Sequence, residues 1–237
     1  MSKRVQYIKS FLCYKKRSNK KIIEPIMKLG GVPVFYKEIT WPKCSFCNQD
    51  LDFLAQITLD SPLPFSKRYS LAYIFMCPGK FDKQGRLKCP TWQPNSGANY
   101  VILQEKSLNI FPSIHDSKYP DYEIILKPIK EPNIDISKDF HLGDEILKAI
   151  CESTKVGGVP SWLQNNQTPI CPKCGGSMRF VAQFDAELDG VLPADPKMWN
   201  PEDFRFFHFG GDDGIGYLFI CEKECSPEGV SFLWQCT

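Results

Sequence analysis

The sequence has few histidines and almost no net charge. Only 3 of its 237 residues are histidine, and 29 basic side chains stand against 27 acidic ones, for a formal net charge of +2. Such a balance gives no global electric field of the kind that attracts nucleic acid or an anionic membrane. We therefore expect a partner that is recognised by shape and local chemistry, and we expect neither a nucleic acid nor a membrane in that role.

Long hydrophobic runs are also missing. No apolar stretch approaches the roughly 20 residues that span a bilayer, and the N-terminus lacks the apolar core and cleavage site of a signal peptide. Its first 21 residues instead include eight basic ones, so contact with a nucleic acid through this segment stays open as an alternative. The lack of targeting features predicts a cytoplasmic protein, where a reducing environment disfavours disulfides.

Familiar catalytic motifs are absent. The sequence contains no phosphate-binding loop, dinucleotide fingerprint or metalloprotease helix motif. His115 and His141 lie in polar segments, and His208 lies in an aromatic run that is typical of packed residues. We therefore predict a protein that is not an enzyme. The alternative is a metal-dependent enzyme or small-molecule binder built around His208, Asp212 and Asp213.

An internal repeat organises the chain. The segment KLGGVP at Lys28–Pro33 recurs as KVGGVP at Lys155–Pro160, and 11 of the 29 positions from residue 28 to 56 are identical at this offset. About two identities would be expected by chance at average residue usage. The second copy carries an insertion of 17 residues between Gln183 and Tyr217, after which the similarity resumes. The sequence therefore predicts two copies of one structural unit.

Each copy shows the same order of motifs. A Gly-Gly-x-Pro turn precedes a Cys-x-x-Cys knuckle, and short aromatic and β-branched runs then predict antiparallel strands. In the first copy these runs are residues 51–59, 70–77 and 85–92, and in the second copy they are residues 178–186, 216–221 and 229–236.

A helix is expected before each Gly-Gly-x-Pro turn. Near the N-terminus, Val5, Ile8, Phe11 and Leu12 have helical spacing, and the second helix is predicted over Gly143–Glu152. The expected class is thus a β-rich α+β fold, in which a helix, zinc knuckle and antiparallel strands form a unit that is used twice.

The two units are expected to pack as one pseudo-symmetric body, a single domain over residues 1–237. We place repeat one at about residues 22–104, an extended connector with one strand at 105–142, and repeat two at about 143–237.

The 11 cysteines contain metal-ligand spacings. In repeat two, Cys171 and Cys174 form one pair and Cys221 and Cys225 form another, which predicts a closed zinc site with four thiolate ligands. Buried free thiols and a redox Cys-x-x-Cys are the alternatives, but the first explains no paired spacing and the second lacks a βαβ context.

Repeat one has a less complete set. Cys44, Cys47 and Cys77 match three ligands of repeat two, and Cys89 is the nearest remaining cysteine. We predict a second zinc on these four residues, with a fold that holds there without metal as the alternative. The other three cysteines, Cys13, Cys151 and Cys236, are interpreted as small apolar residues.

Two glutamines follow the knuckles at the same distance. Gln56 and Gln183 lie inside apolar strands, and a buried amide must be hydrogen-bonded. We predict that each one ties backbone groups together within its own repeat, rather than binding a ligand.

The motifs of repeat two resemble those of the YwqG-like family, a bacterial domain of unknown function. They are KVGGVP at Lys155–Pro160, the Cys171–Cys174 knuckle, FVAQ at Phe180–Gln183, GYLFIC at Gly216–Cys221, and WQC at Trp234–Cys236. The same combination is similar to the programmed cell death protein two family of eukaryotes.

The resemblance covers about residues 25–93 and 150–237 and implies a duplicated, β-rich α+β fold. Some bacterial members have few cysteines, which implies that metal is not obligatory. For function, it implies binding rather than catalysis. Eukaryotic relatives chaperone a small-subunit ribosomal protein, and bacterial relatives often occur beside polymorphic toxins. We therefore expect a cytoplasmic, zinc-stabilised protein that binds another protein, in its most specific form an immunity protein.

Overall fold

The computed structural model describes residues 6–79, 88–133, 150–188, 206–210 and 214–237. These residues form twelve strands, and among them only residues 150–152 are α-helical. The strands are β1 (Tyr7–Arg17), β2 (Lys28–Leu29), β3 (Val34–Phe35), β4 (Asp52–Thr58), β5 (Leu71–Met76), β6 (Asn99–Gln104), β7 (Phe111–Pro112), β8 (Tyr122–Pro132), β9 (Lys155–Gly157), β10 (Met178–Asp185), β11 (Ile215–Cys221) and β12 (Val230–Gln235). The expected α+β class is therefore wrong, because the protein is almost entirely β.

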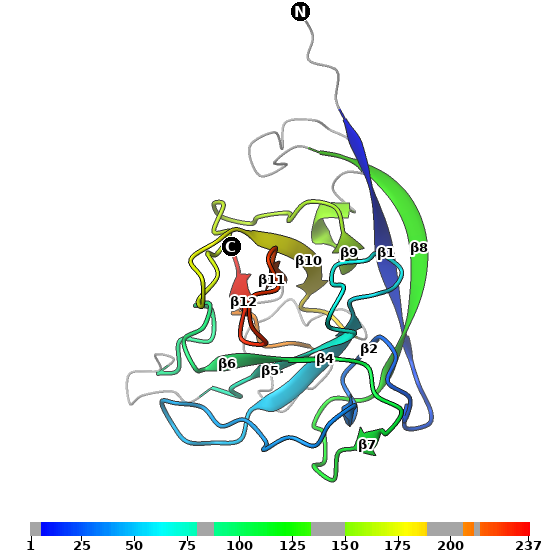
Figure 1. Ribbon diagram of the computed structural model, residues 1–237, viewed down its shortest axis with the longest axis vertical. Coiled ribbons are helices and arrows are strands. Elements are labelled where there is room, and N and C mark those ends of the chain that lie inside the picture. Colours follow the sequence, from blue (N-terminus) through cyan, green and yellow to red (C-terminus); the bar gives the residue numbers. More distant parts are fainter. Residues whose placement is uncertain (1–5, 80–87, 134–149, 189–205, 211–213) are drawn as a thin grey trace, which may run out of the picture.

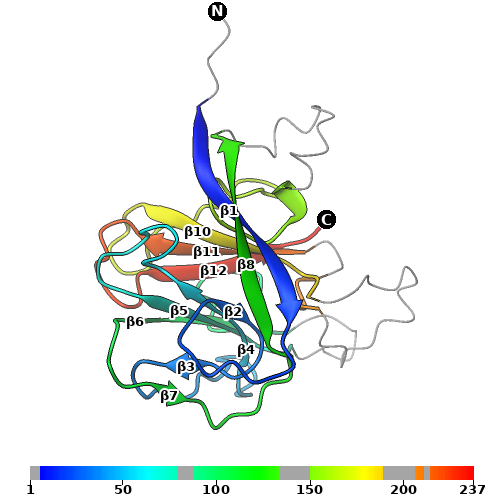
Figure 2. The same ribbon diagram turned by 90° about the vertical axis from the view of Figure 1, so that its right-hand side faces the viewer.

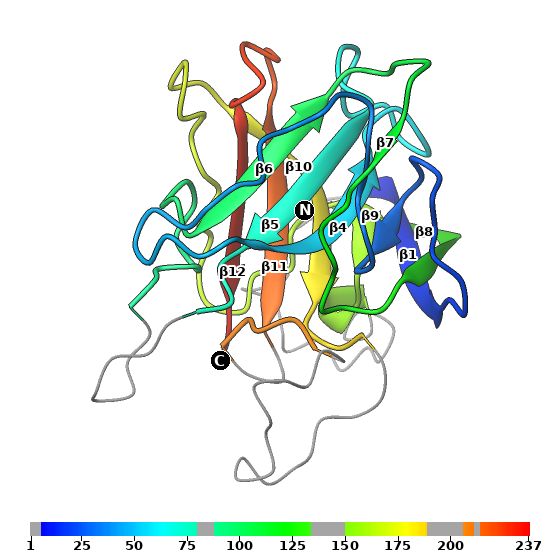
Figure 3. The same cartoon turned by 90° about the horizontal axis from the view of Figure 1, so that it is seen from below.

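Ten strands form one antiparallel sheet in the order β12-β11-β10-β9-β1-β8-β2-β4-β5-β6, and β3 and β7 form a separate pair. The sheet curls until it is nearly closed, so that β4 to β6 lie against β10 to β12 (Figures 2 and 3). Within the described part of the chain, no helix has the length and hydrophobicity needed to cross a bilayer.

A long two-stranded ribbon joins the two halves of the sheet (Figure 1). Strands β1 and β8 pair over eleven residues, from Tyr7 opposite Pro132 to Arg17 opposite Tyr122. Their outer partners are crossed: β1, which precedes repeat one, pairs with β9 of repeat two, whereas β8, which precedes repeat two, pairs with β2 of repeat one. Each repeat therefore completes its sheet with a strand from beside the other repeat.

The helix predicted near the N-terminus is a strand. Phe11 and Cys13 are buried two residues apart, and both lie on the inner side of β1. The helical spacing was misleading because β1 packs apolar side chains on both of its faces. The partner that decides its conformation, β8, lies more than 100 residues further along the chain. Most of the second predicted helix, Gly143–Glu152, lies outside the described residues.

The third strand of repeat one also differs from the prediction. The described residues of the predicted run 85–92 form turns, whereas β6 begins at Asn99 and pairs with β5. The other predicted strands after the knuckles correspond to β4, β5, β10, β11 and β12. Cys89 therefore lies in a loop between β5 and β6, not in a strand.

The central strands are buried on both faces, which divides the core into three layers. On β5, Ala72, Ile74 and Met76 face the core between the two halves, and the alternate residues face outward. Two outer cores cover the outward faces, one in each repeat. The outer core of repeat one includes Cys44, Cys77 and Cys89, and that of repeat two includes Cys171 and Cys221. Segments between the turn and the knuckle close these outer cores.

A buried lysine anchors each Gly-Gly-x-Pro turn. The Lys28 ammonium lies 2.6 Å from an Asp121 carboxylate oxygen, and the Lys155 ammonium lies 2.9 Å from a Glu131 carboxylate oxygen. Both lysine side chains are fully buried. Because burial disfavours the charged form, it lowers the pKa of Lys155, and the Glu131 carboxylate opposes that shift. Glu131 belongs to β8 and Asp121 directly precedes it, so the ribbon holds both turns.

The second glycine of each turn makes room for this carboxylate. Gly158 has a φ of +79°, and a Cβ there would overlap the Glu131 carboxylate. Gly31 has a φ of +62° and the same relation to Asp121. Glycine is required here both for the backbone conformation and for the close approach.

The structural roles predicted for the two glutamines are confirmed. Gln56 accepts a hydrogen bond from the Val34 amide and donates to the carbonyls of Glu24 and Ile26. Gln183 makes the three equivalent bonds in repeat two, with Ser161, Cys151 and Ser153.

A second pair of glutamines has the same kind of role. Gln104 at the end of β6 and Gln235 at the end of β12 each accept two amide hydrogen bonds from the segment before the knuckle and donate back to a carbonyl of that segment. The sequence comparison missed them because the offset between the repeats changes again before β6.

Replacing Gly158 by alanine should destabilise the protein strongly. The left-handed conformation costs an alanine about 1–2 kcal/mol, and displacing Glu131 breaks a buried ion pair, which costs about 3–5 kcal/mol. We expect a loss of at least about 3 kcal/mol in urea unfolding. Gly175→Ala is the matched control, since Gly175 has a φ of +66° with no atom close to the added Cβ; it should lose about 1–2 kcal/mol. Equal losses would contradict this role of Glu131.

Candidate functional site

The structure brings the eight predicted ligands together in two groups. Cluster A consists of Cys44, Cys47, Cys77 and Cys89, and cluster B consists of Cys171, Cys174, Cys221 and Cys225. Within each cluster all four sulfurs lie within 4.8 Å of one another. Both clusters are positioned to hold a metal ion.

The Cys-x-x-Cys knuckles form tight turns with the same geometry. The Asn48 amide donates to the Cys44 carbonyl at 2.8 Å, and the Gly175 amide donates to the Cys171 carbonyl at 2.9 Å. Asn48 and Gly175 both have a left-handed backbone, which asparagine and glycine tolerate better than other residues. The turn directs both cysteine side chains of a knuckle toward the same point.

The other ligands of the two clusters come from different places. Cys77 directly follows β5, and Cys221 is the last residue of the equivalent strand β11, as the sequence repeat predicts. Cys225 lies in a short turn after β11, whereas Cys89 reaches cluster A from the loop before β6. The fourth sulfur of cluster A therefore comes from a position that has no equivalent cysteine in repeat two.

The distances between sulfurs fit a tetrahedral metal site. Zinc binds thiolates at about 2.3 Å, which gives an edge of about 3.8 Å between sulfurs in a tetrahedron. The structure has 3.6 Å between Cys47 and Cys77, 3.5 Å between Cys171 and Cys225, and 3.7 Å between Cys174 and Cys221. A disulfide would require about 2.05 Å, so these contacts are not disulfides.

In cluster B the environment favours the thiolate of Cys221 and disfavours that of Cys225. Burial raises the pKa of Cys221, but hydrogen bonds from backbone groups of Cys225 and Lys223 and from neighbouring thiols outweigh it and lower that pKa to about 7. Burial and the neighbouring thiols raise the pKa of Cys225 to about 12. Four thiolates at this separation repel one another, so a cation is needed to hold them all deprotonated.

The clusters differ in their exposure to solvent. In cluster A three cysteines are buried and Cys47 is half-buried, whereas in cluster B Cys174 and Cys225 are exposed. A chelator can therefore reach cluster B more easily than cluster A.

Each cluster also fixes a contact between the two repeats. Between Cys221 and Cys225, the Glu224 carboxylate accepts hydrogen bonds from the Ser66 hydroxyl and from the amides of Lys67 and Arg68 in repeat one. The loop that carries Cys89 reaches from repeat one to repeat two. Its Asn95 side chain donates to the Ser231 hydroxyl of β12, and its Thr91 hydroxyl accepts from the Trp234 indole.

The remaining predicted features are partly placed. Cys13 and Cys151 are buried and Cys236 is half-buried, and none of them belongs to a cluster. His115 stacks on Trp41 with ring centroids 4.2 Å apart, and His208 is exposed. His141, Asp212 and Asp213 lie outside the described residues.

The described aromatic residues of the inserted segment are buried. They are Phe206, Phe207 and Phe209. Phe209 packs on Phe232 and Trp234 of repeat two. Phe207 and Phe209 belong to the central core. Trp199 lies outside the described residues.

No protein-family model matches the chain, and no curated protein is similar to it. The resemblance to the YwqG-like and programmed cell death protein two families therefore stays a prediction.

Metal analysis of the purified chain should find two ions per chain. Cys47→Ser and Cys174→Ser should each leave one ion, because three thiolates and a hydroxyl hold a metal much less tightly than four thiolates. Cys236→Ser should leave two. Inductively coupled plasma mass spectrometry gives these numbers directly, and fewer than two ions in the unaltered chain, purified without chelator, would contradict a metal in both clusters.

Release of the two ions by a chelator should occur in two phases. The exposed sulfurs of cluster B predict that it loses its ion first, and the buried sulfurs of cluster A predict a slower second phase. The Cys174→Ser variant should show only the slow phase and Cys47→Ser only the fast one. A colorimetric chelator measures both rates, and the reverse assignment would show that exposure does not control release.

Proposed function

We propose that this is a zinc-stabilised, non-enzymatic, cytoplasmic protein that binds another protein. Two features support the absence of a catalytic metal. Each cluster offers four thiolates, which fill a tetrahedral zinc ion, and catalytic zinc needs an open position for water or substrate. The clusters also hold contacts between the repeats, which is a structural task.

The observation that carries the binding proposal is an apolar segment at residues 108–114. Single exposed apolar residues are ordinary, but Leu108, Ile110 and Ile114 are all exposed within seven residues, and Leu108 and Ile114 almost completely so. This apolar segment lies in the connector between the repeats. Clustered apolar side chains of this kind are typical of protein interaction sites.

The backbone of the apolar segment is held in place. Its strand β7 pairs with β3, with Val34 opposite Pro112 and Phe35 opposite Phe111, and the Ser113 amide donates to the Pro33 carbonyl at 3.0 Å. Since the backbone is already ordered, little conformational entropy is lost when these side chains meet a partner.

The most specific version of the proposal is neutralisation of a toxin, and the alternative is a dedicated chaperone of a ribosomal protein. The family resemblance supports both. The two versions predict different results. A toxin expressed alone should stop cell growth, and co-expression of this protein should restore growth. A ribosomal client should instead stay soluble only when this protein is present.

Affinity purification from native cells should recover a stoichiometric partner. With that partner in hand, the Leu108→Ser/Ile114→Ser double variant should bind at least tenfold more weakly, because truncating a hot-spot side chain costs about 2 kcal/mol or more. Ile23→Ser is the matched control, since Ile23 is exposed but lies outside the apolar segment, and it should bind normally. Calorimetry measures both affinities.

Two results would contradict the proposal. Repeated recovery of no stoichiometric partner would argue against protein binding, and an unchanged affinity of the double variant would remove the apolar segment from the interface.

A further inference from the structure

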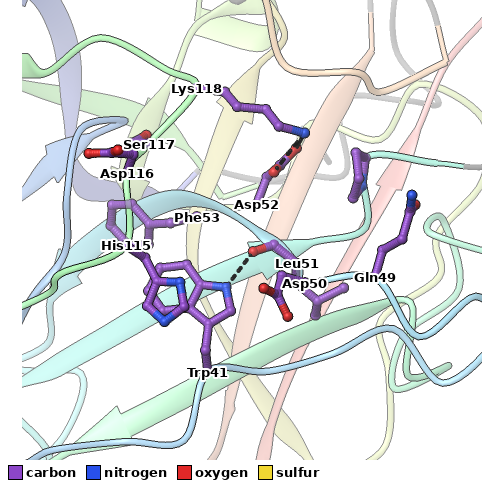
Figure 4. A pocket seen from close by; sticks show the side chains of 11 residues that line it. Trp41, Gln49, Asp50, Leu51, Asp52, Phe53, His115, Asp116, Ser117 and Lys118 are labelled. Atoms are coloured by element: carbon purple, nitrogen blue, oxygen red, sulfur yellow. Dashed lines mark hydrogen bonds and ion pairs between the residues drawn. The ribbon is translucent and has the colours of Figure 1, made fainter.

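A cavity of about 250 Å³ lies between the knuckle of cluster A and the connector. Residues 49–53 form one side of it and residues 115–118 form the other, with Trp41 at its base (Figure 4). The connector residues follow directly after the apolar segment. The cavity and the exposed apolar side chains therefore share one stretch of chain.

A fixed aromatic wall bounds the cavity. The Trp41 indole N–H donates to the Leu51 carbonyl at 2.9 Å, and its ring packs edge-on against Phe75. His115 lies nearly parallel to the Trp41 ring, with an interplanar angle of 21° (Figure 4). These contacts hold a flat, polarisable surface ready for a flat ligand group.

The charged groups that line the cavity are mostly acidic. Three carboxylates, of Asp50, Asp52 and Asp116, face one ammonium, of Lys118, among the described residues that line it. Asp50 also pairs with Lys43 at 2.9 Å, but both side chains of that pair are more than half exposed, and such pairs contribute little. The cavity is thus suited to a ligand that carries positive charge.

Asp52 is the carboxylate that gains most from a cation. Its side chain is only 15% exposed and lies 3.1 Å from the Lys118 ammonium. Burial raises the pKa of Asp52 despite the opposing effect of Lys118, so the single ammonium does not fully compensate the buried charge. Lys118 is itself 46% exposed and can swing into water when another cation arrives.

Of the basic groups in proteins, a guanidinium fits this cavity best. It is planar, more weakly hydrated than an ammonium, able to bond two carboxylate oxygens at once and able to stack on an aromatic face. The Trp41 and His115 rings offer the stacking surface, and Asp52 and Asp50 offer the oxygens. Arginine is also enriched among the residues that dominate protein interfaces.

We propose that this cavity receives an arginine side chain of the protein bound by the apolar segment. The inference rests on the proposed function, since the arginine belongs to that partner. The apolar segment supplies the desolvated contact and the cavity supplies charge recognition beside it. In the free protein the Lys118 ammonium pairs with the Asp52 carboxylate, and the arginine displaces it on binding. Lys118 therefore competes with the arginine for Asp52 and does not help to bind it.

The cavity can be tested without the partner by using a small probe on the full chain. N-acetyl-arginine amide should shift the NMR signal of the Trp41 indole N–H, assigned with Trp41→Phe, in a saturable way. N-acetyl-citrulline amide has the same shape without the charge and should bind at least tenfold more weakly.

Three variants should change the affinity for the arginine probe in three different ways. Asp52→Asn should weaken binding of the arginine probe at least tenfold. Asp60→Asn, just beyond the far end of β4, should leave it unchanged. Lys118→Gln should strengthen binding several-fold, because it removes the competing ammonium. The amide spectrum of each variant shows whether it is folded, and the gain expected for Lys118→Gln does not depend on Asp52→Asn folding.

The results separate this inference from the proposed function. Equal shifts with arginine and citrulline probes, or weaker binding by Lys118→Gln, would overturn the cavity as a guanidinium site. If a recovered partner binds the Asp52→Asn variant as tightly as the unaltered protein, that partner does not place an arginine in the cavity. The proposal that the protein binds another protein would still stand. At least tenfold weaker binding of the partner by Asp52→Asn, with Asp60→Asn normal, would support the use of the cavity by that partner.

Discussion

The structure depends on the pairing of β1 with β8. Among the described strands, the backbone ladders of the two halves of the sheet join at this ribbon. Its outer partners are crossed, so that each repeat is completed by the strand that precedes the other. Two buried ion pairs reinforce it, because the acids that hold Lys28 and Lys155 lie on β8 or directly before it. Removing one partner of such a pair leaves an unpaired buried charge. The strands of both repeats therefore belong to one continuous sheet.

The metal clusters follow from burial on both faces of the central strands. Strands such as β5 and β11 carry large apolar side chains outward as well as inward, so each repeat needs a cover over its outer face. The covers are short segments with little regular structure, and a cover of this size buries too little surface to stay ordered by itself. In each repeat four sulfurs, positioned to hold one metal ion, join the cover to the strand beneath it. Beside these clusters, Glu224 and the Cys89 loop reach across to the opposite repeat.

Features that are local or repeated could be predicted from the sequence. Features that depend on pairing with a strand far along the chain could not. The knuckles, most strands and the roles of Gln56 and Gln183 could be read from spacing, because each is repeated in the same register. The N-terminal segment was assigned to a helix because only its pairing with β8 reveals a strand. The position of β6 was missed because the repeats lose register before it. Cys89 could be proposed as a ligand only by counting cysteines, since no matching position in repeat two supports it.

The differences between the repeats separate the positions that build the fold from those that are free to serve a function. Positions that build the scaffold are the same in both copies, such as Lys28 and Lys155 or Tyr73 and Tyr217, whose hydroxyls donate to equivalent carbonyls. The acidic cavity uses positions that have diverged. Asp52 corresponds to Arg179, which donates to the Phe65 carbonyl and so belongs to the contact between the repeats. Trp41 corresponds to Thr168, and residues 115–118 of the connector lie beside the knuckle of repeat one. Because the scaffold is already provided twice, one copy can change its surface around the knuckle without loss of the fold.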